Sequence, residues 1–426
     1  MTTLKSCVAK LFGKKFYDSL KKIYYIPIVR YFYPAYQHIY VKRLRKKKMI
    51  NVVFIASSLS MWRYQQVYDL LAEHPRFKAS IIIIPFIKYS HEQQKEEILR
   101  LKSNFDSLRI PYYVAGDTVH DIRKEFSPDI LFYPQPYDGS FSSQYEHINF
   151  RDKLLCYTPY AFWMSKDFWS YNLKLHNYAW KVFYSTELHR KDAQAEAYNK
   201  GRNVEVVGYT NADNFLADSH CDVWKPQKVR KKKIIWAPHY TIFSGELVEQ
   251  SNFLWMAELM LELAKKYEDT LQFAFKPHPR LKSELYNHPD WGKQKTDAYY
   301  EAWATQHNTQ LETGGYIDLF MTSDAMIHDS GSFCVEYHYT KNPVMYMAKN
   351  FEEQVSVKGD FGQLAMRLHY VGSNQSDIIR FIDDVVQNGN DSMKEHRNDF
   401  YNQYLLPPNG KTVAENIIEV LLKSLS

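Results

Sequence analysis

Residues 325–339, AMIHDSGSFCVEYHY, hold two apolar runs separated by Asp329 and a Ser-Gly-Ser sequence. Serine and aspartate are favoured at helix N-termini and glycine suits a tight turn, so the stretch predicts a strand, a turn and a helix. A helix N-terminus also offers unpaired backbone N–H groups, and neighbouring hydroxyls can complete a cradle for phosphate. The stretch is therefore compatible with a structural turn and with a phosphate site.

The same alternation of short apolar runs and helix-compatible segments extends through the chain on both sides. Helical patterns occupy, for example, residues 91–108 and 252–267. Strands that alternate with helices indicate parallel sheets, so we predict an α/β fold with two Rossmann-like domains in tandem. The strands are expected within residues 49–58, 77–86, 111–116, 128–137, 154–160, 234–241, 271–280, 316–324, 325–333 and 342–348.

The length of 426 residues fits two domains of average size. A charged, proline-containing segment interrupts the alternation near the middle and is expected to be a linker. The carboxyl ends of the strands in both domains are expected to face a cleft, where ligands bind in such folds. The predicted parts are a basic arm (1–48), a first domain (49–212), a linker (213–231), a second domain (232–400) and an amphipathic C-terminal helix (401–426).

The positive charge is concentrated at the N-terminus: residues 1–50 carry a net charge of +12 and the remaining residues carry −6. Tyr, Phe and Ile alternate there with Lys and Arg, and no run approaches the ~20 apolar residues of a spanning helix. No signal peptide is recognisable either. The arm therefore predicts peripheral binding to an anionic membrane surface. A solvated helix and a nucleic-acid contact are the alternatives, although no other segment resembles a nucleic-acid-binding module.

The four cysteines, Cys7, Cys156, Cys221 and Cys334, show no regular spacing and no Cys-x-x-Cys pair. This pattern indicates neither a disulfide framework nor a zinc site and is typical of a reducing, cytosolic setting. No Asp-x-Asp pair follows a predicted strand, so we expect no bound metal and a metal-independent reaction.

Three polar motifs follow predicted strands of the second domain, and each one alone is compatible with an ordinary loop. Because the carboxyl ends of parallel strands share one edge, we expect the motifs to meet there. Histidines, cations and hydroxyls together can stabilise the charge of a diphosphate, and an acid one helical turn later can bind ribose hydroxyls. The candidate residues are His239 and Thr241; Lys276, His278 and Arg280; and Asp329, Ser330, Gly331, Ser332 and Glu336.

The segments KPHP (276–279) and HDSGSFCVE (328–336) are similar to the His-Pro and Ser-rich motifs of GT-B transferases that use cytidine nucleotides. With VVGYTNADNF (206–215) and IIWAPHYT (234–241), their order resembles the CDP-glycerol glycerophosphotransferase (teichoic-acid polymerase) family. The resemblance implies a GT-B fold. It also implies that His278, Ser330 and Ser332 contact the donor pyrophosphate and nucleotide, and that Glu336 lies near the ribose.

The sequence departs from this family at one place in the first domain. Members of the family carry a His-Gly-Thr-Pro motif whose histidine is the expected base, whereas this chain reads CYTPYAFW (156–163), with Tyr157 at that position. His239 is one candidate for the missing base, because an imidazole that titrates near neutrality can take a proton from a hydroxyl. Asp138 is the other, although its Asp-Gly sequence also fits a simple turn.

We therefore expect a transferase on the cytoplasmic face of the membrane. It would move glycerol phosphate, or a related polyol phosphate, from a CDP-linked donor to a hydroxyl of a lipid-linked or polymeric surface glycan, with the nucleotide donor as substrate and no separate cofactor. A transferase using a CMP-linked acidic sugar is the first alternative. A nucleotide-sugar epimerase and a non-catalytic nucleotide-binding subunit are the others. Neither the acceptor nor the oligomeric state follows from the sequence.

Overall fold

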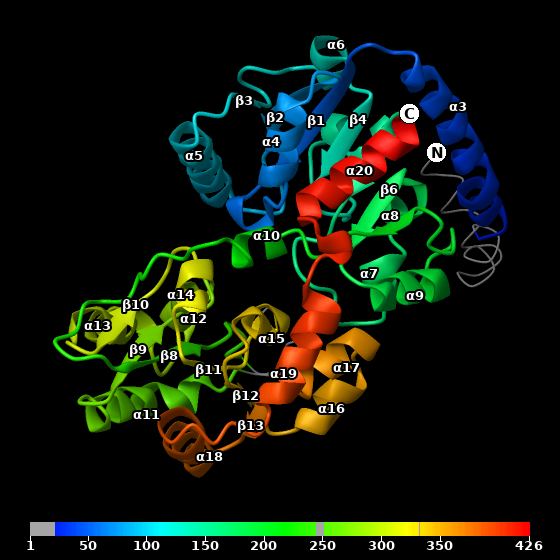
Figure 1. Ribbon diagram of the computed structural model, residues 1–426. Helices are drawn as coiled ribbons and strands as arrows, with labels where there is room; N and C mark the ends of the chain where they lie inside the picture. The colour runs from blue at the N-terminus through cyan, green and yellow to red at the C-terminus, as the bar shows by residue number, and fades with distance from the viewer. Residues whose placement is uncertain (1–21, 244–250, 332) are drawn as a thin grey trace, which may run out of the picture. The chain divides into compact units, whose positions relative to one another are not determined.

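The computed structural model describes residues 22–243, 251–331 and 333–426. The chain forms two compact units. One contains the chain up to Ala212 together with Pro407–Ser426, and the other contains Asp213–Leu406. The last twenty residues thus return to the unit in which the chain begins, as the red helix in Figure 1 shows.

The first unit is built on a seven-stranded parallel sheet in the order β3-β2-β1-β4-β5-β6-β7. The order reverses between β1 and β4, as in Rossmann folds. Both faces of the sheet are buried, which explains the near-continuous apolar runs such as the isoleucines at 81–84. The strands are β1 (Ile50–Ala56), β2 (Phe77–Ile83), β3 (Tyr112–Val114), β4 (Ile130–Tyr133), β5 (Leu154–Tyr157), β6 (Lys181–Tyr184) and β7 (Val204–Val206).

Helices cover this sheet, and aromatic side chains form much of the interface. On one face the Phe54 ring stacks on Phe132 with ring centroids 4.6 Å apart, and Tyr68 of α4 meets Phe54 edge-on. The C-terminal helix α20 lies beside α4 and buries Leu421 and Leu425 completely (Figure 1). The helices are α3 (Tyr33–Arg45), α4 (Gln65–Glu73), α5 (His91–Ser107), α6 (Ile122–Phe126), α7 (Phe168–Tyr171), α8 (Lys174–Tyr178), α9 (Glu187–Glu196) and α20 (Val413–Leu425).

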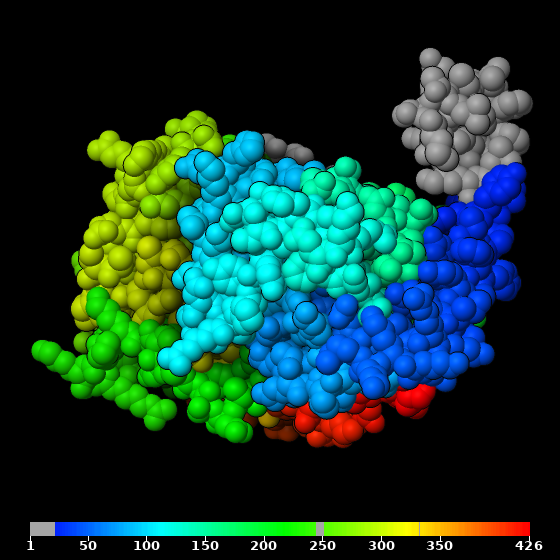
Figure 2. Space-filling model, turned by 90° about the horizontal axis from the view of Figure 1, so that it is seen from above, coloured from blue at the N-terminus to red at the C-terminus, as the bar shows by residue number. Residues whose placement is uncertain are grey.

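The basic arm is helical from residue 22 to Arg45, with a π-helical turn at Ile28–Phe32. One side of it packs on the first unit (Figure 2). There the Gln37 amide donates to the Tyr178 carbonyl at 2.8 Å. The buried positions recur every three or four residues: Val29, Tyr33, Gln37, Val41 and Leu44. Residues 1–21 of the predicted arm lie outside the described residues, and no helix in the described part has the length and apolar character of a membrane span.

The second unit repeats the arrangement with a six-stranded parallel sheet in the order β10-β9-β8-β11-β12-β13. Its order reverses between β8 and β11. The predicted α/β fold with two Rossmann-like domains is therefore confirmed. The strands are β8 (Lys232–Ala237), β9 (Leu271–Phe275), β10 (Thr309–Leu311), β11 (Ala325–His328), β12 (Val344–Met347) and β13 (Tyr370–Gly372). The strand expected at 316–324 is wrong: this short apolar run forms the helix α14 (Ile317–Met321), which buries Leu319 and Phe320.

An aromatic cluster holds β8 and β9 of the second unit in place. The Trp236 ring stacks on Phe253 and Phe275, with centroids 5.6 and 5.0 Å away, and Trp303 packs on Phe275. Because these side chains are fully buried, the loops that follow β8 and β9 start from fixed positions. The helices are α10 (Ala212–Phe215), at the start of the unit, then α11 (Phe253–Lys266), α12 (Leu281–Asn287), α13 (Gly292–Thr305), α14 (Ile317–Met321), α15 (Phe333–Glu336), α16 (Phe351–Ser356), α17 (Asp360–Met366), α18 (Gln375–Arg380) and α19 (Lys394–Phe400).

Candidate functional site

The site of the second unit is organised by the carboxylate of Asp329, at the point where the strand order reverses. Its Oδ1 accepts the backbone N–H of His239 at 2.6 Å. Its Oδ2 accepts the backbone N–H of Asn252 at 2.6 Å and the Ser251 hydroxyl at 2.9 Å. One side chain thereby joins the loop after β8, the start of α11 and the turn after β11. The structure gives Asp329, predicted as a nucleotide contact, a positioning role.

The motifs after β8 and β9 come together, as predicted from their place at one sheet edge. The rings of His239 and His278 have centroids 5.0 Å apart, and Tyr240 lies 4.5 Å from His278. The Arg280 guanidinium lies over the Tyr240 ring at 4.1 Å. Two imidazoles and a cation therefore share one small, partly exposed area of the second unit.

Both histidines are held in the neutral form. Burial, with the nearby His239, Arg280 and Lys276, lowers the pKa of His278 to about 3. Burial also lowers the pKa of His239, against the opposing effect of Asp329. His278 Nδ1 accepts the Arg280 backbone N–H at 3.2 Å, which leaves the ring proton on Nε2. Neutral imidazoles can donate a hydrogen bond or accept a proton, but they add no positive charge before a ligand binds.

The Lys276 side chain supplies a buried cation beside this pair. It is only 6% exposed, and its ammonium donates to the Gly314 carbonyl at 2.7 Å. Burial lowers its pKa to about 8, with Glu312 acting in the opposite direction. Because burial disfavours the charged form of Lys276, an anion that binds nearby would favour the protonated ammonium.

The turn after β11 departs in part from the predicted cradle. Ser330 is buried, Gly331 is exposed, and Ser332 lies outside the described residues. Helix α15 has only four residues and continues as a 3-10 turn, so its dipole is weaker than that of a long helix. Glu336 is buried rather than solvated, and it accepts the Tyr316 hydroxyl at 2.9 Å. Thr241 is also buried, and its hydroxyl lies 3.0 Å from His239 Nδ1.

Asp138 belongs to the first unit and differs from the second-unit residues in its surroundings. It pairs with His147 Nε2 at 3.3 Å and with the Lys174 ammonium at 2.5 Å. Burial opposes ionisation, but the contacts with His147 and Lys174 prevail and lower the pKa of Asp138 to about 2. A carboxylate that holds protons so weakly is a poor general base near neutrality.

Tyr157, at the position of the family's histidine, is fully buried at the end of β5. A histidine does lie beside it: the His176 ring is 5.3 Å away, and burial lowers the pKa of that imidazole to about 3. Sequence reasoning missed this neighbour, because the two residues are nineteen positions apart and come together only through the packing of α8 on β5.

Comparison with known proteins decides the family. A family model described as CDP-Glycerol:Poly(glycerophosphate) glycerophosphotransferase matches residues 163–423, which is more than half of the chain. The chain belongs to this family. The match confirms the resemblance carried by the second-domain motifs and begins only at the end of the divergent segment 156–163. No curated protein matches the sequence.

Solved structures share the fold at low identity. The wall teichoic acid polymerase TagF, solved as a variant, is 12% identical, with 96% of this chain and 97% of that chain covered and a TM-score of 0.56. The UDP-GlcNAc 2-epimerase from Neisseria meningitidis bound to UDP-GlcNAc is 16% identical, with coverages of 88% and 100% and a TM-score of 0.53. S. aureus MnaA with UDP is 12% identical, with coverages of 89% and 97% and a TM-score of 0.54. At identities this low, the similarities show only that the chain shares the fold of these proteins.

The role of Asp329 can be tested with Asp329→Asn. The amide would place a donor against the N–H of His239 or of Asn252, so we expect the free energy of unfolding in urea to fall by about 1–3 kcal/mol. Asp290→Asn changes an exposed aspartate of the same unit and is expected to stay within about 0.5 kcal/mol of the wild type. Equal urea midpoints for the two variants would contradict the positioning role.

Proposed function

We propose that this protein transfers glycerol phosphate, or a related polyol phosphate, from a CDP-linked donor to a hydroxyl of a cell-surface glycan or teichoic-acid-like acceptor. The observation that carries the proposal is family membership over a region that contains the whole second-unit site. Within that region, His239, His278 and Lys276 gather at the strand ends where Rossmann-like folds bind nucleotides.

In the proposed reaction, the acceptor oxygen attacks the phosphorus that bears the glycerol. The bond from this phosphorus to the oxygen of CMP breaks, CMP leaves, and the proton of the attacking hydroxyl passes to a base. Lys276 and Arg280 offset the charge that grows on CMP, so the chain's own cations do this work in place of a metal ion. Glu336 receives the ribose hydroxyls.

We assign the base to His239 in preference to Asp138. The imidazole is neutral at physiological pH and its Nδ1 is oriented by Thr241. Asp138 is tied to His147 and Lys174 and has a pKa of about 2, so it would accept a proton far less readily.

Donor preference is the first test of the proposal. We expect CDP-glycerol to bind more tightly than CMP-sialic acid, CMP, UDP or GDP in calorimetric titrations, and CMP to be released once an acceptor is added. His278→Ala and Ser330→Ala remove groups near the donor phosphates and are expected to weaken CDP-glycerol binding by about tenfold or more, since hydrogen bonds to charged groups contribute about 1.5–3 kcal/mol.

His307→Ala, which changes an exposed histidine of the same unit, is the matched control and is expected to bind like the wild type. Preference for a CMP-linked acidic sugar would favour the sugar-transferase alternative. Turnover of a nucleotide sugar without any acceptor would point to an epimerase. Indifference to all five ligands would contradict the proposal.

The titration of Lys276 predicts a pH dependence of donor binding. The ammonium of the free protein loses its proton as the pH rises through about 8, and a bound diphosphate favours the charged form. Affinity for CDP is therefore expected to fall above pH 8, by up to about tenfold per pH unit. Lys276→Met should bind CDP more weakly near neutrality and lose this dependence, whereas Lys349→Met, at an exposed position, should retain it. An unchanged pH profile in Lys276→Met would refute this role.

We further propose that the arm holds the protein on the cytoplasmic face of an anionic membrane, close to a lipid-linked acceptor. The support is its outer side, which leaves large apolar residues more than half exposed beside exposed cations. Such a surface suits the boundary between lipid headgroups and acyl chains. The exposed apolar residues are Ile23, Tyr24, Tyr31, Phe32 and Ile39, and the cations include Lys42, Arg43 and Lys46.

Replacement of Tyr31, Phe32 and Ile39 by serine should reduce co-sedimentation with phosphatidylglycerol vesicles by about tenfold or more, because each buried apolar side chain contributes on the order of 1.5–3 kcal/mol. Leu99→Ser with Leu108→Ser removes exposed apolar groups elsewhere in the first unit and serves as the control. Wild-type sedimentation that persists in the arm variant would exclude this surface as the membrane contact.

A further inference from the structure

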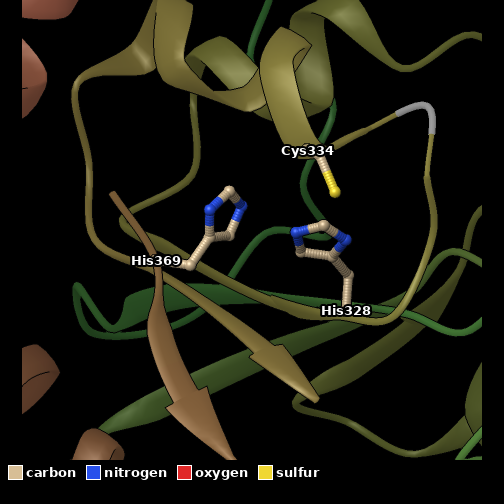
Figure 3. A group of neighbouring side chains, drawn as sticks. All are labelled: His328, Cys334 and His369. Carbon is tan, nitrogen blue, oxygen red and sulfur yellow. The ribbon is translucent and has the colours of Figure 1, made fainter. Parts of the chain in front are cut away.

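Three potential metal ligands converge beneath the turn that follows β11. His328 is the last residue of β11, Cys334 lies in α15, and His369 immediately precedes β13. All three are buried, and one donor atom of each lies within 4.8 Å of the other two. Figure 3 shows the two imidazole rings turned toward each other, with the Cys334 sulfur pointing toward them from α15 and nearer to the His328 ring.

The ring nitrogen that faces the cluster from His369 carries a lone pair. Its Nδ1 lies 3.0 Å from the Met366 carbonyl and 3.2 Å from the Ala365 carbonyl. Carbonyl oxygens only accept, so Nδ1 holds the proton and Nε2 does not. Among the described residues, this buried Nε2 has no hydrogen-bond partner.

His328 can adopt the same arrangement. Its Nδ1 lies 3.1 Å from the Ser330 carbonyl and 3.2 Å from the Ser330 backbone N–H, so this nitrogen can donate to the first or accept from the second. When Nδ1 donates to the carbonyl, the lone pair is on Nε2, which is buried and has no partner within the described ranges. A backbone carbonyl that holds the second nitrogen of an imidazole is the usual outer contact of a metal-bound histidine. Burial lowers the pKa of both rings, that of His369 to about 4, so both are in the neutral form that binds metals.

The Cys334 thiol completes the set. It donates to the Ser330 carbonyl at 3.5 Å, and burial raises its pKa to about 12, so the group stays protonated until a cation binds. A coordinating thiol is deprotonated by its metal. Coordination would therefore release one proton and exchange a weak S–H···O contact for a metal–sulfur bond.

We infer that His328, Cys334 and His369 form a binding site for a thiophilic cation of the zinc type, through the two unpartnered Nε2 atoms and the cysteine sulfur. Bonds of about 2.0–2.3 Å would bring the donor atoms to roughly 3.5 Å from one another, a closure of about 1 Å that side-chain torsions can supply. Three protein ligands leave a fourth position open.

The ion would stabilise the candidate donor turn. His328 and Cys334 stand before and after this turn in the sequence, so one ion bound to both side chains would link its two ends. The bond to His369 would link the same ion to the start of β13. The site takes no part in the proposed transfer step, and its existence does not depend on the identity of the donor.

Cobalt(II) binding to the full chain tests the site. After removal of metals by a chelator and dialysis, we expect one equivalent of Co²⁺ to bind, with a thiolate-to-cobalt charge-transfer band in the near ultraviolet that Zn²⁺ abolishes. Cys334→Ser should lose the band and weaken Zn²⁺ binding by more than about 100-fold, since even outer contacts of a metal contribute 10- to 100-fold. Cys156→Ser removes another buried thiol, in the first unit, and should keep the band.

A second measurement needs no cysteine variant and so does not depend on the folding of Cys334→Ser. One equivalent of Zn²⁺ should raise the thermal midpoint of the metal-free wild type and leave that of His369→Gln unchanged. The inference is overturned if the wild type binds neither ion at stoichiometric concentration. It is also overturned if the charge-transfer band survives Cys334→Ser or disappears in Cys156→Ser.

Discussion

The hydrogen bonds to Asp329 are the constraint on which the second-unit site depends. Parallel strands that reverse their order leave a gap at one sheet edge, and the backbone donors of the flanking loops must find acceptors there. The Asp329 carboxylate serves two backbone N–H groups and one hydroxyl at this point. Without it, the loop that carries His239 and the first residues of α11 would have no common anchor.

Burial then decides the charge of the site. His239 and His278 lie close together and are partly buried, which disfavours two positive charges, so both are neutral and the positive charge of the site resides on Lys276 and Arg280. The buried Lys276 ammonium has a carbonyl rather than a carboxylate as its partner. A diphosphate would supply the missing negative charge, so the unfavourable desolvation of Lys276 becomes a source of selectivity for anions.

The sequence predicts much of this site and little of its surroundings. Strand ends can be located because apolar runs stop at Pro238, Lys276 and Asp329, and parallel strands bring such ends together. The strands β7 and β10 have three residues each and no usable periodicity, so the sequence does not predict them. The equally short β3 is predicted because Pro111 and Gly116 bound its apolar residues. The burial of Glu336 and the packing of the arm depend on contacts with residues distant in sequence, which no local pattern encodes. The His328–Cys334–His369 group was missed for the same reason, since its last member lies 35 residues beyond the cysteine.

The last residue of β11 and the residue that follows it contact two different parts of the second unit. Successive strand residues point to opposite sides of a sheet, so His328 enters the buried cluster with His369 while Asp329 reaches the loop after β8. The turn is therefore held from both sides: by hydrogen bonds to a carboxylate on the side of the candidate donor site, and by the His328 and Cys334 side chains on the other. Because these contacts fix Asp329 and Ser330, the backbone at these two residues would lose little conformational freedom if a phosphate bound there. That preorganisation does not require a long helix, so an α15 of only four residues is compatible with the proposed phosphate contact.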